Sequence, residues 1–169
     1  MSKVAVGGTF EYLHDGHKAL IKKAFELADG DEVYIGLTSN KMARQRTRDV
    51  DDFQIRKSNL LQYIENLEIP KKRYIVVELT DPYGTTLADN FDYIVVSPET
   101  FPVALKINEL REQSGCSQIE IINVEYVMAD DEVPISSTRI ACGEIDEHGH
   151  LKNKKAPFGC KFIVATANP

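Results

Sequence analysis

Short apolar runs alternate with amphipathic stretches along most of this chain. The runs are rich in β-branched residues and nearly continuous, which is typical of parallel strands that are covered on both faces. They predict five strands, at Val4–Val6, Val33–Leu37, Tyr74–Leu79, Tyr93–Val96 and Ile119–Val124. Between the runs, helical spacing predicts helices over about residues 16–28, 52–66 and 102–113, and a last one that begins near Ser136. This order predicts an α/β fold with a parallel sheet and right-handed crossovers.

The predicted helix at residues 52–66 has an apolar face that we expect to be buried. Its members are Ile55, Leu60, Tyr63, Ile64 and Leu67. In parallel sheets, ligands bind outside the carboxyl ends of the strands, where the strand order reverses. The turn after the first strand lies at such an end, so we expect chemistry there.

Length and composition narrow the protein class. The 169 residues favour one domain, which we expect to span residues 1–146 and to be followed by a tail, 147–169, of unclear role. The net charge of −6 excludes a general affinity for nucleic acid. No apolar run approaches the ~18 residues that a membrane span requires. Cys116, Cys142 and Cys160 show no paired spacing, which indicates a reducing compartment, so we expect a cytoplasmic protein.

The densest group of chemically useful residues is Gly7–His17. Its two glycines let the backbone approach a ligand closely, and its threonine supplies a hydroxyl donor. His14 and His17 are three residues apart, so both point the same way at a helix start. A helix start also offers free N–H groups and a partial positive charge. The group suits a polyphosphate and predicts nucleotide chemistry, although a tight turn with two surface histidines is the alternative.

A second group lies at Pro134–Ile140. Ser136, Ser137 and Thr138 open the last predicted helix, and any of them is a suitable N-cap. The same hydroxyl and N–H groups also bind phosphate, with Arg139 as a fixed cation. If this helix start faces the first group, the two would clamp a triphosphate from both sides.

A basic cluster follows the second predicted strand, in an otherwise acidic chain. Thr38–Lys41 is followed by Arg44, Arg46 and Arg48. Lys41 and Arg44 are nearest the strand end and predict an anionic substrate, whereas a solvated surface explains Arg46 and Arg48 equally well.

Two further segments, Asp81–Thr86 and Ser97–Thr100, follow predicted strands and resemble proline-containing turns. Tyr83 is a candidate to pack against the arm of a substrate. Asn108 and Arg111 lie one turn apart on the third helix. They are expected either to reach a nucleotide or to face solvent.

The histidine-containing group at Gly7–His17 and the hydroxyl-rich group at Pro134–Ile140 together resemble the motifs of the HxGH nucleotidyltransferase superfamily. The resemblance implies a Rossmann-like five-stranded parallel sheet with helices on both faces. Within the superfamily, the chain is most similar to phosphopantetheine adenylyltransferases of the archaeal and eukaryotic type, over roughly residues 3 to 146. This narrower resemblance is carried by Thr38–Asn40, Asp81–Gly84, Ile94–Thr100, Asn108, Arg111 and Gly143–Asp146. The bacterial type has an Arg-Gly segment where this chain has Ser97–Thr100, so its phosphate-binding arginines are not carried over.

The resemblance implies transfer of AMP from ATP to 4'-phosphopantetheine, which gives dephospho-coenzyme A and pyrophosphate in coenzyme A biosynthesis. The attacking phosphate is already an anion, so catalysis reduces to positioning and charge stabilisation. On this basis His17 and Thr9 are expected at the α-phosphate and His14 at the phosphates nearby. Lys41 would bridge the incoming phosphate and the reacting centre.

The remaining expected site residues bind the two substrates. The expected ligands of ATP besides these include Gly8, Phe10, Ser136, Ser137, Thr138 and Arg139, of which the last four hold the β- and γ-phosphates. Thr9, Lys41, Arg44 and Tyr83 are expected to bind 4'-phosphopantetheine. No acidic cluster predicts a metal cage, so Mg²⁺ is expected to arrive with ATP.

Three alternatives share these motifs. One is another HxGH nucleotidyltransferase, such as a cytidylyltransferase or a dinucleotide-forming adenylyltransferase. The others are a nucleotide-binding regulator without catalysis and a fragment related to class I aminoacyl-tRNA synthetases. The sequence leaves the oligomeric state and the binding of the pantetheine arm open.

Overall fold

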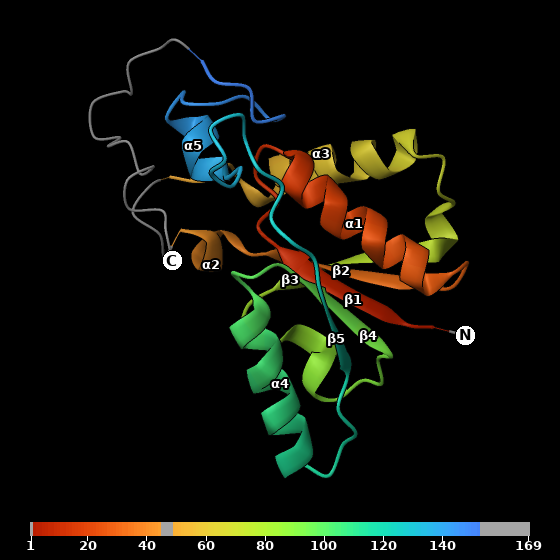
Figure 1. Cartoon of the computed structure of the whole chain (residues 1–169). Coiled ribbons are helices and arrows are strands. Elements are labelled where there is room, and N and C mark those ends of the chain that lie inside the picture. The colour runs from red at the N-terminus through yellow and green to blue at the C-terminus, as the bar shows by residue number, and fades with distance from the viewer. Residues whose placement is uncertain (1, 45–48, 153–169) are drawn as a thin grey trace.

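The computed structural model describes residues 2–44 and 49–152. At its centre is a five-stranded parallel sheet in the order β3-β2-β1-β4-β5 (Figure 1). The strands are β1 Val4–Gly8, β2 Val33–Thr38, β3 Tyr74–Leu79, β4 Tyr93–Val96 and β5 Glu120–Asn123. The five predicted strands are confirmed. The strand order reverses at β1, because the chain leaves β3 at one edge and returns to β4 on the other side of β1.

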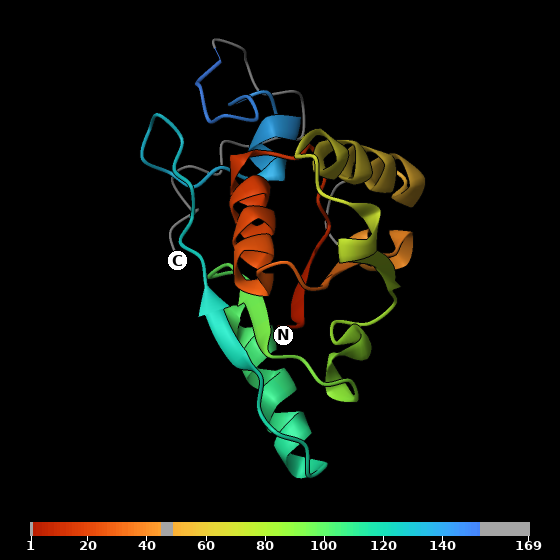
Figure 2. The same ribbon diagram turned by 90° about the vertical axis from the view of Figure 1, so that its right-hand side faces the viewer.

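Helices cover both faces of the sheet, as the resemblance implied (Figures 1 and 2). One face carries α1 Asp15–Ala28 and α3 Phe53–Asn66, and the other carries the 3₁₀ helix η2 Gly84–Leu87 and α4 Phe101–Gln113. The short elements are α2 Asn40–Ala43, η1 Lys71–Arg73 and α5 Ser137–Ala141. Right-handed crossovers produce this division, because the chain adds β2 and β3 in one direction and β4 and β5 in the other.

The core has two layers because successive strand residues point to opposite faces. Val4 and Val6 of β1 pack with Ile21 of α1 and Leu60 of α3. Ala5, between them in sequence, joins the layer under α4. Burial on both faces explains why the strands read as continuous apolar runs rather than as alternating patterns.

The buried stripe of α3 differs from the predicted one. Leu60 and Ile64 are buried as expected, but Ile55 is 52% exposed and Leu67 is 42% exposed. The stripe begins instead with Arg56, which is only 1% exposed. Positions 56, 60 and 64 share one helix face, so Ile55 lies beside that face. Hydrophobicity alone therefore misplaced the first turn of this stripe.

Asn108 and Arg111 are structural residues, so both expected alternatives for them are wrong. The Asn108 side-chain amide donates to the carbonyl of Ile119 at 2.8 Å and accepts from its N–H at 2.7 Å. The Arg111 guanidinium donates to three backbone carbonyls before and after α4, each at 2.7 Å. Both side chains are buried and tie α4 to the neighbouring loops.

Residues 147–152, the start of the segment expected to be a tail, are part of the folded unit. The Asp15 N–H donates to the carbonyl of Glu147 at 3.0 Å, and the Asp130 N–H donates to that of Gly149 at 2.9 Å. The Lys152 N–H donates to the carbonyl of Glu144 at 2.9 Å. Residues 153–169 lie outside the described residues.

Two further observations bear on the protein class. Cys142 is disulfide-bonded and Cys116 has a free thiol. The lack of paired spacing, from which we expected a reducing compartment, does not measure how close cysteines lie in space. Among the described helices, none is long and apolar enough to cross a membrane.

Candidate active site

The turn between β1 and α1 holds two non-glycine residues in the left-handed region, Phe10 at φ 51° and Tyr12 at φ 60°. Such conformations cost about 1–3 kcal/mol each, so the surrounding structure must hold them. Phe10 is 1% exposed. Between the two, a carboxylate oxygen of Glu11 accepts from the Asp51 N–H at 2.7 Å, and the Glu11 carbonyl accepts from the Ser137 hydroxyl at 2.7 Å. Contacts with residues that are distant in the sequence thus hold the turn in this conformation.

His14 caps the helix that it precedes. Its Nδ1 accepts from the N–H groups of Gly16 at 3.1 Å and His17 at 3.3 Å, and His17 Nδ1 accepts from the His14 N–H at 3.3 Å. The two rings stack with centroids 3.7 Å apart. A Cβ on Gly16 would lie 2.8 Å from the His14 ring, which explains the glycine between the histidines.

Burial keeps both rings neutral, and the capping bonds determine which nitrogen carries the proton. Burial lowers the pKa of His14 to about 4, against the opposing effect of Asp15. Burial, reinforced by His14, lowers the pKa of His17 to about 2. Both rings are therefore neutral at pH 7, and because each Nδ1 accepts, each proton resides on Nε2. The site contains two neutral N–H donors, not two cations.

The N–H groups at the start of α1, which we expected to bind phosphate, are already bonded. Those of Gly16 and His17 donate to the His14 ring. The Asp15 N–H donates to the carbonyl of Glu147, and the Lys18 N–H donates to that of His14 at 3.1 Å. The helix therefore contributes its partial charge and the two imidazole donors.

A cavity of about 230 Å³ lies at the start of α1, and we call it the polar cavity because its lining contains more polar groups than that of the second cavity described below. It brings the two predicted groups together, since Gly8, Thr9, Phe10, His14 and His17 share its wall with Ser136, Ser137 and Thr138. The other walls come from residues 97–100 after β4 and residues 124–127 after β5. Sequence reasoning missed Val124, at the end of a predicted strand, and residues 125–127, which directly follow it.

Arg139 does not serve as expected. It is 2% exposed and forms an ion pair with Asp131, and its Nε lies 3.6 Å from a carboxylate oxygen of Glu144. A buried charge requires such partners, so the guanidinium is committed to holding segment 131–144 together. Ser136 caps α5 by accepting from the Arg139 N–H at 3.2 Å. Of this group, Ile135 and the three hydroxyl residues line the cavity, and Arg139 is not among the described residues that line it.

Of the basic cluster after β2, the described residues Lys41 and Arg44 do not line either cavity. Lys41 is exposed on α2, and Arg44, also exposed, places Nη2 3.5 Å from the carbonyl of Val50. Their roles toward a phosphate stay predictions. Arg46 and Arg48 lie outside the described residues.

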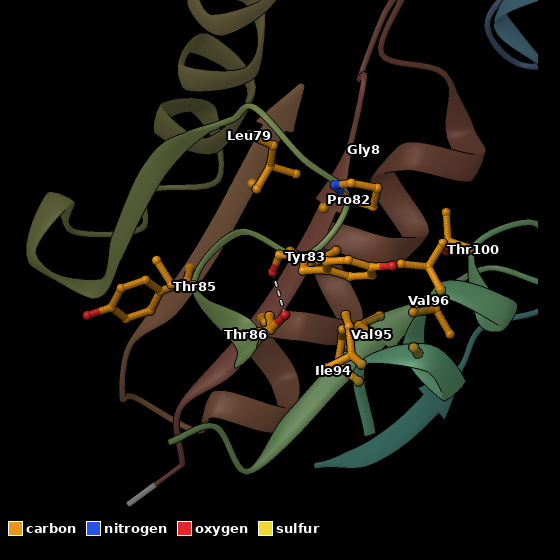
Figure 3. A pocket seen from close by; sticks show the side chains of 18 of the residues that line it. Gly8, Leu79, Pro82, Tyr83, Thr85, Thr86, Ile94, Val95, Val96 and Thr100 are labelled. Carbon is orange, nitrogen blue, oxygen red and sulfur yellow. Dashed lines mark hydrogen bonds between the residues drawn. The ribbon is translucent and has the colours of Figure 1, made fainter. Parts of the chain in front are cut away.

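A second cavity, of about 200 Å³, lies on the face of the sheet that carries η2 and α4 (Figure 3). Its walls are apolar and include Tyr83, which was expected to pack against a substrate arm, with Leu79 and Ile94. Gly36 of β2 forms part of the floor, and a Cβ there would lie 2.7 Å from a methyl group of Leu79.

The two cavities meet at the carboxyl ends of β1 and β2. Gly7, Gly8, Thr38 and Thr100 line both of them. At this junction the Thr38 hydroxyl donates to the Thr9 hydroxyl at 3.0 Å. A polar ligand in one cavity and an apolar arm in the other would therefore touch at these residues.

Known proteins resemble the chain over most of its length. The family model described as cytidylyltransferase-like matches residues 5–143. A phosphopantetheine adenylyltransferase from Methanosarcina acetivorans is 59% identical over 154 residues, which are 91% of this chain and 98% of that protein. One from Archaeoglobus fulgidus is 50% identical over 153 residues, 88% and 99% of the two chains.

A solved structure agrees with these relatives. It is an Archaeoglobus fulgidus protein described as having unknown function, with a TM-score of 0.66 and 48% identity over 72% of this chain and 88% of that one. The chain belongs to the cytidylyltransferase-like family and, within it, to the phosphopantetheine adenylyltransferases.

Proposed function

We propose that this protein transfers AMP from ATP to 4'-phosphopantetheine, giving dephospho-coenzyme A and pyrophosphate. The observation that carries the proposal is the meeting of a polar and an apolar cavity at Gly7, Gly8, Thr38 and Thr100. The polar cavity suits ATP and the apolar one suits the pantetheine arm. The relatives that share the family carry the name of this activity.

The chemistry balances without a protein nucleophile. A phosphate oxygen of 4'-phosphopantetheine attacks the α-phosphorus of ATP, the bond from that phosphorus to the β-bridging oxygen breaks, and pyrophosphate leaves. Charge develops on the α-phosphate oxygens and the leaving group. Thr9, His14 and His17 line the cavity where these oxygens would lie, and each imidazole has its donor on Nε2. Because both imidazoles are neutral and held by capping bonds, they act as fixed donors, not as proton carriers.

The substrate on the polar side is MgATP. Within the described residues, no group of three or more His, Cys, Asp and Glu side chains is placed to hold a metal ion. The hydroxyl residues Ser136, Ser137 and Thr138 line the same cavity as the histidines and would meet the β- and γ-phosphates. Lys41 and Arg44, exposed after β2, would neutralise the incoming phosphate.

The test is an acceptor panel with the purified full chain. MgATP is supplied with 4'-phosphopantetheine, nicotinamide mononucleotide or flavin mononucleotide, and CTP with glycerol 3-phosphate. We expect pyrophosphate release only with 4'-phosphopantetheine and ATP, with dephospho-coenzyme A identified by mass. His17→Asn, assayed in parallel, should lose this release and so exclude a contaminating enzyme. ATP binding without pyrophosphate from any acceptor, or faster turnover with another pair, would overturn the proposal.

A further inference from the structure

Arg56 is a buried cation beside the site that the reaction chemistry does not use. It is 1% exposed, so it does not meet substrate in the folded protein. Its Nη1 donates to the carbonyl of Thr9 at 3.0 Å and to the hydroxyl of Thr38 at 3.3 Å. Its Nε donates to the carbonyl of Asp51 at 2.8 Å, and its Nη2 to the side-chain oxygen of Asn40 at 3.3 Å. One guanidinium thus joins the β1 turn, the end of β2 and the start of α3.

These bonds determine which way the neighbouring hydroxyl protons point. A guanidinium only donates, so the Thr38 oxygen accepts from Arg56. The Thr38 proton is then directed to the Thr9 oxygen, 3.0 Å away. Because that oxygen accepts, the Thr9 proton is turned away from Thr38. Thr9 lines the polar cavity beside His14 and His17.

We infer that Arg56 and Thr38 are positioning residues, which hold the Thr9 hydroxyl as a donor aimed at the reacting phosphate. The inference rests on the proposed function. The proton of an unconstrained hydroxyl is distributed over three staggered positions. The hydrogen-bond relay from Arg56 through Thr38 to Thr9 selects among these positions before substrate binds. Donation from a charged group through Thr38 also polarises the Thr9 hydroxyl and strengthens the bond that it gives.

The competing explanation is that Arg56 and Thr38 only stabilise the fold. A structural role would lower stability or substrate binding whether or not residue 9 carries a hydroxyl. A positioning role operates through that hydroxyl and disappears when it is removed. A double-mutant cycle between positions 9 and 38 therefore separates the two explanations.

The experiment compares Thr9→Val, Thr38→Val and the double variant in the full chain. Steady-state kcat and both KM values are measured with MgATP and 4'-phosphopantetheine. We expect Thr38→Val to lower kcat about five- to tenfold with both KM values within about threefold, and Thr38→Ser to restore kcat. In the Thr9→Val background, the same Thr38→Val change should alter kcat less than about twofold. Ser58→Ala, on the exposed side of α3, is the control and should match the wild type.

Other outcomes overturn the inference. An unchanged kcat in Thr38→Val, or an equal loss with and without the Thr9 hydroxyl, would show that the relay does not act on turnover. Urea unfolding of each variant identifies any that fails to fold, and Arg56→Lys then supplies a second route. It should lower kcat in the wild-type background but not in Thr9→Val. Wild-type turnover is measured first, so a failure of the proposed function is seen before the cycle begins.

Discussion

Lowering the pH from 7 to 5 is expected to weaken the folded state through His14 and His17. Burial lowers the pKa of His14 from 6.5 to about 4, and that of His17 to about 2. In the unfolded chain both imidazoles regain an ordinary pKa near 6.5. Between about pH 6.5 and pH 4 the unfolded state therefore binds protons that the folded state does not. Stability falls as the pH falls through this window.

The size of the effect follows from the two pKa values. At pH 5 an imidazole with a pKa of 6.5 gains about 2 kcal/mol from protonation, and at pH 7 it gains almost nothing. In the folded state neither ring is substantially protonated at pH 5. Each histidine thus removes about 2 kcal/mol on acidification, and the pair about 4 kcal/mol. This is a large share of the roughly 5–15 kcal/mol that stabilises a typical domain.

Urea unfolding at pH 7 and pH 5 measures this loss. The chain contains no tryptophan, so the helical circular dichroism signal is the suitable probe. The control is a variant with Asn at positions 14 and 17, because Asn keeps an oxygen acceptor near the place of Nδ1 but does not titrate. We expect the wild type to lose about 4 kcal/mol more than this variant. Equal losses would show that the two histidines are not held neutral, which would refute the assignment of Nε2–H donors.

Substitutions at three positions test the site more locally. His17→Asn keeps the capping acceptor but removes the distal donor, so kcat should fall about 100–1000-fold, whereas His17→Gln, which retains a distal N–H, should lose less. Equal losses in steady-state kcat would contradict this distinction. Gly16→Ala usually stabilises a helix by about 0.5–1 kcal/mol, but here a Cβ 2.8 Å from the His14 ring should lower the urea midpoint instead. Gly36→Ala should displace Leu79 and raise KM for 4'-phosphopantetheine while KM for ATP stays within about twofold; an equal rise in both would contradict the division of the cavities.

The sheet and its covering helices were predictable because their signals are local. A continuous β-branched run can be buried on both faces only in a covered sheet, and the helical stretches between the runs dictate parallel pairing. The Gly7–His17 group could be placed because it directly follows a strand end. The Pro134–Ile140 group begins well after β5, so its approach to the first group was a hypothesis, which the shared cavity supports.

The roles of buried polar residues were not predictable in the same way. Asn108 and Arg111 were candidate ligands because the sequence does not show which backbone carbonyl groups a polar helix residue will bond in the folded protein. Arg139 sits within a phosphate-binding pattern but is paired with Asp131, which lies before α5 and outside that pattern. The sequence did indicate a special role for Arg56, because the residue falls on the apolar stripe of α3, where burial of an unpaired cation would be costly.

The spacing of the histidine motif is explained by helix capping as well as by chemistry. His14 must precede the helix by one position for its Nδ1 to reach the next N–H groups, and His17 must lie three residues later to return the bond. Gly16 is required between them because the capping ring occupies the space of a Cβ. Once both Nδ1 atoms accept from the backbone, both protons reside on Nε2. The bonds that begin the helix therefore also prepare the two donors, so a substitution that breaks the cap should impair turnover even where the imidazoles remain.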